Sequence, residues 1–260
     1  MDLGLTDKVA LVTGGSEGVG RGIAACLAGE GAKVVICARR QDVLEQAAAE
    51  LREQTGGEIL ALAADVSEAA DIERVVAEAA DHFGRIDILV NNAGRSFAKP
   101  FEELDDADWD ADLGLKFNAA VRCSRAVIPH MRQVGGGRII NITHPGGKAP
   151  SAGSLPTSVS RAAGIALSKA MSQDFAGDNI LVNTVCLNSI KSAQTRRYWE
   201  ARGGDESLEA FERKMGQRVP VGRLGEPEEV GALVAFLASS HAGFITGTAV
   251  NIDGGASPVV

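Results

Sequence analysis

The apolar residues of this chain gather into seven short runs, which alternate with longer stretches of mixed polarity. The runs are rich in Val, Ile, Leu and Ala and show no polar alternation, which is typical of strands covered on both faces. They span Val9–Thr13, Lys33–Ala38, Ile59–Ala64, Ile86–Asn91, Arg138–Thr143, Ile180–Cys186 and Thr248–Ile252.

The stretches between these runs have the length and the spacing of apolar residues expected of helices. Strand–helix alternation of this kind predicts right-handed βαβ units. We therefore expect an α/β chain with a single Rossmann-type, doubly wound fold: a seven-stranded parallel sheet with helices on both faces. No linker or repeat divides residues 1–260, so one domain is predicted. The predicted helices include Val43–Gln54, Ala69–Phe83, Trp109–Arg132, Ser158–Phe175 and Pro227–Ala238.

The segment Ser192–Val219 breaks this rhythm, because it is densely charged and contains the pair Gly203–Gly204. It follows the sixth strand, at the end of the sheet where ligands bind in such folds. We predict a substrate lid over 192–219. The alternative is an ordinary solvated helical excursion.

Composition narrows the range of functions. With 45% hydrophobic residues, a formal net charge of -8 and a pI near 5.1, the chain is unsuited to nucleic acid or to an anionic membrane. No apolar run approaches a membrane span, and no secretory signal is recognisable, so a cytoplasmic protein is expected. The histidines and cysteines are dispersed without metal-ligand spacing, so no metal is expected. The cysteines, expected to be small buried residues, are Cys26, Cys37, Cys123 and Cys186.

A glycine-rich turn, Thr13–Gly20, comes directly after the first predicted strand and opens a helix. Glycines there permit a tight turn and let the backbone approach a pyrophosphate, while the helix N-terminus supplies free N–H groups. The pattern is GxxxGxG rather than GxGxxG, and alone it could be a tight βα loop. Its place between an apolar strand and a helix favours a dinucleotide site.

Further motifs follow in order: Asp65 and Val66 after the third strand, Asn91–Gly94 after the fourth, and Asn118 in the next helix. Together with the glycine-rich turn and the C-terminal segments, they resemble the short-chain dehydrogenase/reductase family over essentially the whole chain. The C-terminal segments are Gly222–Pro227, Ile245–Gly247 and Asp253–Gly255.

The resemblance implies a role for each matched position. The glycine-rich turn would cradle the pyrophosphate, Asp65 and Val66 would lie against the adenine, and Ile190 and Ser192 would receive the nicotinamide carboxamide. Homotetramers are common among such relatives, so a homotetramer is expected. In the glycine-rich turn and after the fourth strand, the cofactor-binding positions implied are Gly14, Ser16, Gly18, Val19, Gly20, Asn91, Ala93 and Gly94.

The choice of cofactor depends on the end of the second strand. An acidic residue there would accept hydrogen bonds from a free ribose 2′-hydroxyl. This chain has Arg39 and Arg40 instead, whose guanidinium groups suit a 2′-phosphate. Glu17 opposes this prediction, because phosphate-preferring relatives often carry a basic residue there. We predict NADP(H) in preference to NAD(H).

The proton-transfer positions depart from the family pattern of Ser, then Tyr thirteen residues later, then Lys four beyond. Anchored on Asn141 and Gly147, these positions hold His144, Thr157 and Arg161. A phenol has a pKa of about 10, whereas the pKa of an aliphatic hydroxyl lies much higher, close to that of water. The gap is about 7 kcal/mol, or on the order of 10⁵ in proton transfer, so Thr157 cannot replace a tyrosine unaided.

Three interpretations stay open at this point. His144 could act as the acid or base of a divergent oxidoreductase on a small carbonyl or alcohol, with Thr157, Arg161 and Asn118 beside it. Arg161 could also bind ribose hydroxyls or a developing oxyanion. The fold could instead support a lyase, isomerase or decarboxylase, or a catalytically silent nucleotide-binding subunit. We take the first as our expectation.

Overall fold

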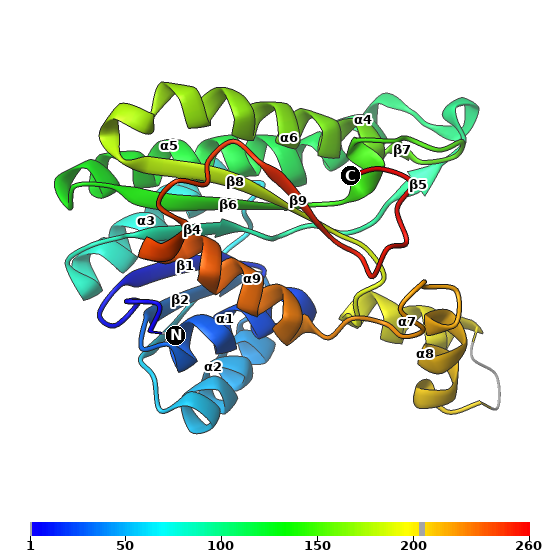
Figure 1. The fold of residues 1–260 in the computed structure, drawn as a ribbon, viewed down its shortest axis with the longest axis horizontal. Coiled ribbons are helices and arrows are strands. Elements are labelled where there is room, and N and C mark those ends of the chain that lie inside the picture. Colours follow the sequence, from blue (N-terminus) through cyan, green and yellow to red (C-terminus); the bar gives the residue numbers. More distant parts are fainter. Residues whose placement is uncertain (1, 203–205) are drawn as a thin grey trace.

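The structure is a computed structural model that describes residues 2–202 and 206–260. Residues 203–205, including the Gly203–Gly204 pair of the predicted lid, lie outside the described residues. Seven parallel strands form one sheet in the order β3-β2-β1-β4-β6-β8-β9 (Figure 1), so the predicted Rossmann-type fold is confirmed. The strands are β1 (Val9–Thr13), β2 (Lys33–Ala38), β3 (Ile59–Ala63), β4 (Ile88–Asn91), β6 (Gly137–Thr143), β8 (Ile180–Leu187) and β9 (Ala249–Ile252).

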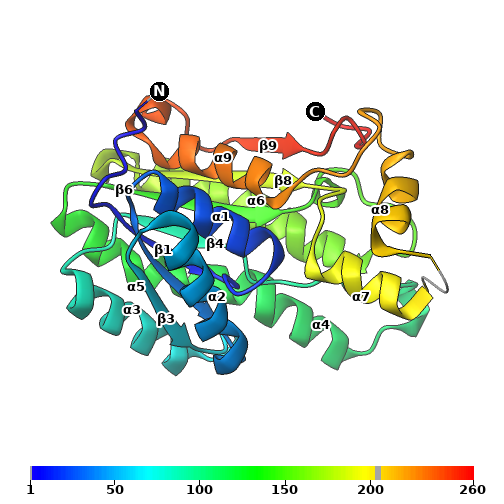
Figure 2. The same ribbon diagram turned by 90° about the horizontal axis from the view of Figure 1, so that it is seen from below.

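Helices cover both faces of the sheet, as Figures 1 and 2 show. One face carries α1 (Gly18–Gly29), α2 (Gln41–Thr55) and α9 (Pro227–Ala238), and the other carries α3 (Ala69–Phe83), α5 (Ala119–Gln133) and α6 (Thr157–Asp174). Successive residues of β1 belong to opposite cores: Ala10 and Val12 to the first, Val9 and Leu11 to the second. This is why its sequence is apolar at every position from Val9 to Val12.

Helices α1 and α9 approach each other closely because glycine stands where they cross. A Cβ added at Gly22 would lie 2.6 Å from the Cβ of Pro227, and one at Gly231 would lie 2.5 Å from the sulfur of Cys26. The contact holds the glycine-rich turn before α1 in a fixed place relative to the sheet.

The predicted helix Trp109–Arg132 is wrong in detail. It consists of α4 (Asp106–Leu113), a π-helical segment over Gly114–Asn118, and α5. Helical spacing read from the sequence assumes 3.6 residues per turn, and a π-turn inserts an extra residue that rotates everything after it. The faces of residues 109–132 therefore cannot be predicted with a single α-helical period.

Two further features lie at the carboxyl end of the sheet. The short strands β5 (Ala98–Lys99) and β7 (Leu155–Pro156) pair antiparallel. The segment predicted as a lid contains α7 (Ala193–Arg202) and α8 (Leu208–Gly216), which Figure 1 shows beyond the strand ends. None of the helices within the described ranges is long and apolar enough to cross a membrane.

Candidate active site

A cleft of about 1410 Å³ runs along the carboxyl ends of the parallel strands, under α7 and α8. Ligands bind at this edge of a doubly wound sheet, where the strand order reverses. The predicted catalytic residues His144 and Thr157 line it. It is also lined by most of the predicted cofactor-binding residues: Gly14, Ser16, Gly18, Val19, Gly20, Arg39, Arg40, Asp65, Val66, Ala93, Gly94, Arg161, Ile190 and Ser192.

The glycine-rich turn has the shape of a pyrophosphate cradle. Gly14 and Gly18 adopt positive φ angles of 67° and 52°, which other residues rarely adopt. A Cβ at Gly14 would lie 3.0 Å from the Cα of Ala93, and one at Gly20 would collide with the carbonyl oxygen of Gly14. Helix α1 begins at Gly18 without a side-chain cap, so its first N–H groups face the cleft. These residues fit a dinucleotide.

Charged groups concentrate where the 2′-position of an adenosine ribose is expected. Arg40 donates through Nη2 to Oε2 of Glu17 at 2.6 Å, and Nη2 of Arg197 from α7 lies 3.3 Å from the same oxygen. Nη1 of Arg39 lies 3.8 Å from Oδ2 of Asp65. Two guanidinium groups thus neutralise the carboxylate of Glu17, whose charge counted against a phosphate site.

Asn91 does not line the cleft. Its amide nitrogen donates to Oδ1 of Asn141 at 2.8 Å, between β4 and β6. Asn92, one residue later, does line it, and its amide donates to the carbonyl of Thr13 at 2.9 Å. The prediction that Asn91 contacts the cofactor is therefore replaced by a role in joining the strands, because alternate residues at a strand end point in opposite directions.

His144 stands at the end of β6, half-buried on the cleft wall. Its Nδ1 accepts a hydrogen bond from the backbone N–H of Gly146 at 2.8 Å. Burial lowers the pKa of His144, Arg161 lowers it further, and the side chain of Asn188 opposes the shift. A neutral imidazole with an accepting Nδ1 carries its proton on Nε2. His144 therefore presents an N–H donor at neutral pH.

Thr157 begins α6, and the protein occupies its hydroxyl completely. The oxygen accepts from Nζ of Lys116 at 2.7 Å and from the N–H of Phe97 at 3.1 Å. Its hydrogen points to the carbonyl of Phe97 at 2.5 Å, with Oδ1 of Asp112 at 3.3 Å. One donor and two lone pairs are thereby used, so no capacity is left for a substrate proton.

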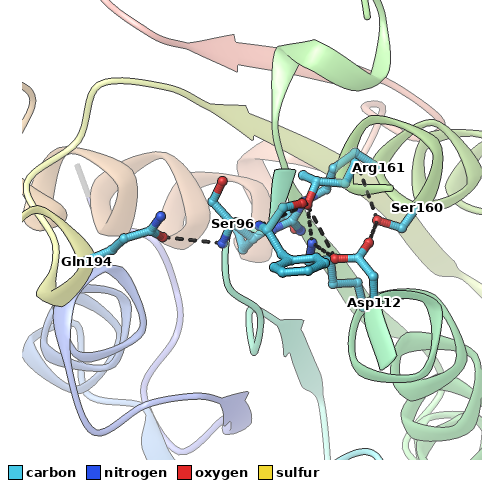
Figure 3. A network of polar contacts seen from close by, with 9 residues as sticks. Ser96, Asp112, Ser160, Arg161 and Gln194 are labelled. Carbon is cyan, nitrogen blue, oxygen red and sulfur yellow. Dashed lines mark hydrogen bonds and ion pairs between the residues drawn. The ribbon is translucent and has the colours of Figure 1, made fainter. Parts of the chain in front are cut away.

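Lys116 and Asp112 form a buried ion pair behind Thr157, with side chains only 2% exposed (Figure 3). Ser160 donates to Oδ2 of Asp112 at 2.6 Å. Burial lowers the pKa of Lys116 to about 8, opposed by its hydrogen bond to Asp112. This pair was not predicted from the sequence, although an Asp and a Lys four residues apart lie on one face of a helix and are a recognisable signal.

The structure does not bring Asn118 to the site. Its side chain is exposed, and it is not among the residues that line the cleft. The π-helical segment turns Lys116 inward and Asn118 outward. The prediction of Asn118 as a catalytic residue is wrong on this geometry, and Lys116 holds the inner position.

Arg161 lies one helical turn beyond Thr157 and projects into the same region. Nη1 donates to the carbonyl of Ile142 at 2.7 Å, whereas Nε is buried without a hydrogen-bond partner. Burial lowers its pKa, opposed by Asp112. Within the described ranges no carboxylate lies within 4.0 Å of its guanidinium group. Arg161 is thus a cation equipped to bind oxygen atoms of a ligand.

Known proteins share this architecture. A family model described as Enoyl-(Acyl carrier protein) reductase matches residues 14–257. "Dehydrogenase/reductase SDR family member 4" of Homo sapiens is 35% identical over 252 residues, 96% of this chain and 88% of that protein. Meso-2,3-butanediol dehydrogenase of Serratia marcescens is 34% identical over 251 residues, 96% and 95% of the two chains. L-sorbose reductase of Gluconobacter frateurii, complexed with NADPH and L-sorbose, superposes with a TM-score of 0.93 at 34% identity, covering 100% of both chains.

Proposed function

Because this chain belongs to the short-chain dehydrogenase/reductase family, we propose that it is an NADP(H)-dependent oxidoreductase that reduces a small carbonyl substrate with His144 as the hydrogen-bond donor. The observation that carries the proposal is the neutral imidazole of His144 on the wall of a cleft that also contains a pyrophosphate cradle. The chain is similar throughout its length to a reductase that binds NADPH and a ketose sugar.

The bound nicotinamide would supply the hydride, and the chain's own residues would handle charge and position. The Nε2–H of His144 donates a hydrogen bond to the substrate oxygen on which negative charge develops, and the alkoxide formed by hydride transfer takes its proton from solvent water in the open cleft. Arg161 keeps its positive charge at neutral pH and stabilises that oxygen or binds the ribose hydroxyls. Thr157 takes no part in proton transfer, since its hydroxyl is committed to Phe97 and Lys116.

NADP(H) is favoured over NAD(H) by Arg39 and Arg40. Neither has a buried partner, and a 2′-phosphate offers stronger acceptors than the exposed carboxylates they now contact. The NADPH bound by the sorbose reductase supports the same choice.

The decisive experiment follows NADPH oxidation at 340 nm over a panel of ketones and ketoses. His144→Ala should lower the turnover by about 10²–10³-fold while the Kd for NADPH stays within about twofold. His241→Ala is the matched control, because His241 is exposed and its Nε2 contacts only the backbone oxygen of Asp2 in the described contacts. Full activity of His144→Ala would refute the role of this residue.

A second candidate, a nucleotide-binding protein without redox turnover, is favoured by the occupied hydroxyl of Thr157. Tight NADPH binding without oxidation of any panel compound would establish it. Substrate consumption without a change at 340 nm would instead indicate a lyase, isomerase or decarboxylase.

We also propose that 192–219 is a lid of this single domain. Oε1 of Gln194 accepts from the N–H of Ser96 at 3.3 Å, so α7 already touches the opposite wall of the cleft. NADPH should protect the segment from limited proteolysis.

A homotetramer is our proposal for the assembly. Phe101 and Phe244, 70% and 104% exposed, are apolar surface that association would cover. A monomer in analytical ultracentrifugation would overturn it.

A further inference from the structure

The ion pair between Lys116 and Asp112 costs free energy to bury, and it does not face the cleft. Both side chains are buried, and a pair of buried charges often adds no net stability compared with apolar residues of similar volume. Asp112 is further satisfied by Ser160, at 2.6 Å. Among the described residues, the lysine amine donates to Asp112 and to Thr157.

The lysine fixes the direction of the Thr157 hydroxyl. An ammonium group can only donate, so Lys116 uses one lone pair of the Thr157 oxygen. The N–H of Phe97 uses the other at 3.1 Å, and the hydroxyl hydrogen must then point to an acceptor. It does so at the carbonyl of Phe97, at 2.5 Å. One threonine side chain therefore holds both backbone groups of Phe97, 60 residues away in the chain.

Phe97 belongs to the segment 95–99, which forms the substrate-side wall of the cleft. Arg95, Ser96 and Ala98 line the cleft directly. The N–H of Ser96 donates to Gln194 of α7 at 3.3 Å, and Figure 3 shows Gln194 reaching this wall from the side opposite Asp112. A continuous path of contacts thus joins the buried ion pair to the wall and to the predicted lid.

We propose that Lys116 is a positioning residue that acts through Thr157 to hold segment 95–99 against the cleft and so set the shape of the substrate pocket. The substrate-pocket role depends on the proposed function, whereas the anchoring of the segment does not. The ring of Phe97 also helps to hold the segment. Nζ of Lys99 lies 4.9 Å from the centroid of this ring and forms an ion pair with Asp108 at 2.9 Å.

Hydrogen exchange measured by mass spectrometry tests the anchoring without any substrate. Thr157→Val removes the hydroxyl but keeps the side-chain shape and leaves the ion pair intact. Exchange in peptides covering 95–99 should rise about tenfold, the equivalent of one lost hydrogen bond. Thr157→Ser keeps the hydroxyl and should behave as the unchanged protein. Wild-type exchange in Thr157→Val would overturn the proposal.

The role of the lysine needs a variant that does not strand a buried carboxylate. The double substitution Lys116→Met with Asp112→Asn removes both charges together. It should raise exchange in 95–99 to the level of Thr157→Val, and adding Thr157→Val to it should produce little further change, because the residues act along one path. Lys169→Met, at an exposed position of α6, is the control.

Two outcomes would contradict the proposal for Lys116. Unchanged exchange in 95–99 would show that Thr157 needs no lysine. A rise spread evenly over the chain would show general loss of stability. Where NADPH oxidation has been established, the double variant should raise the substrate KM at least fivefold while the Kd for NADPH is unchanged. Loss of turnover with unchanged exchange would overturn the anchor and leave the proposed function intact, whereas raised exchange in a protein that oxidises no NADPH would support the anchor and refute the proposed function.

Discussion

The preference for NADPH should depend on Arg40, and the structure gives the size of the effect. The pair between Arg40 and Glu17 is solvent-accessible, with side chains 56% and 38% exposed. Pairs of this kind contribute about 0–1 kcal/mol. A hydrogen bond from arginine to a phosphate oxygen contributes about 1.5–3 kcal/mol. The interaction of Arg40 with a phosphate is therefore more favourable than its pair with Glu17 by about 1–2 kcal/mol.

Arg40→Ala should accordingly raise the Kd for NADPH by about 5–30-fold and leave the Kd for NADH unchanged. Glu17→Gln should have the opposite effect and lower the Kd for NADPH by up to about fivefold. The reason is that Arg40 then has no ion pair with a carboxylate to break before it binds the phosphate. Both constants are obtained by isothermal titration calorimetry at fixed ionic strength, since phosphate contacts weaken with salt.

Arg21→Ala is the control, because Arg21 lies on α1 and pairs with Glu50 at 2.9 Å, away from the residues that line the cleft. An equal loss of affinity for NADPH and NADH in Arg40→Ala would refute the assignment of this residue to the 2′-phosphate. Tighter binding of NADH than of NADPH to the unchanged protein would refute the cofactor choice altogether.

Three further predictions concern packing, thiols and pH. Gly22→Ala should lower the free energy of unfolding by about 1–3 kcal/mol, or Tm by roughly 3–9 °C, because the added Cβ would lie 2.6 Å from Pro227 of α9. Gly29→Ala is the control: its Cβ would lie in open space, so Tm should stay unchanged or rise. Burial raises the pKa of Cys37 to about 12, so a thiol reagent at pH 8 should modify at most the partly exposed Cys26, and native labelling of Cys37 would contradict the fold. Burial lowers the pKa of His144 below its usual 6.5, so the stability that depends on this group should be complete above pH 6.5 and decline below it. A decline in Tm that begins above pH 6.5 and is absent from His144→Ala would contradict the lowered pKa.

The fold was predictable because burial on both faces leaves a strong mark in the sequence. Strands such as β2 and β8 are apolar at nearly every position, since each side chain meets one of two cores. The predicted boundaries differ most at β4, expected from residue 86 and observed from Ile88. Asp87 interrupts the apolar run at this point. Its carboxylate accepts hydrogen bonds from the N–H of Val9 and from the guanidinium group of Arg85.

The shape of the glycine-rich turn was predictable for a related reason: glycines are needed at fixed points of a short loop, some for positive φ angles and some for the close approach of another segment. The surroundings of Thr157 were not. The low acidity of an aliphatic hydroxyl excludes Thr157 from proton transfer. The hydrogen-bond partners of that hydroxyl could not be predicted, because Phe97 and Lys116 lie 60 and 41 residues earlier in the chain. Two-residue strands bring Phe97 there, and strands this short have no periodicity to detect.

The same long-range contacts determine which polar groups can reach a ligand in this cleft. Burial lowers the pKa of Arg161, yet a guanidinium group keeps its charge at neutral pH in proteins. Lys116, with a pKa of about 8, is poised to titrate but lies behind Thr157, whose hydroxyl separates it from the substrate side. His144 combines direct access with a neutral, donating imidazole. In the two proposals made above, the cation that holds the cleft wall and the donor that meets the substrate oxygen are different residues, so substitutions should be able to separate substrate affinity from turnover.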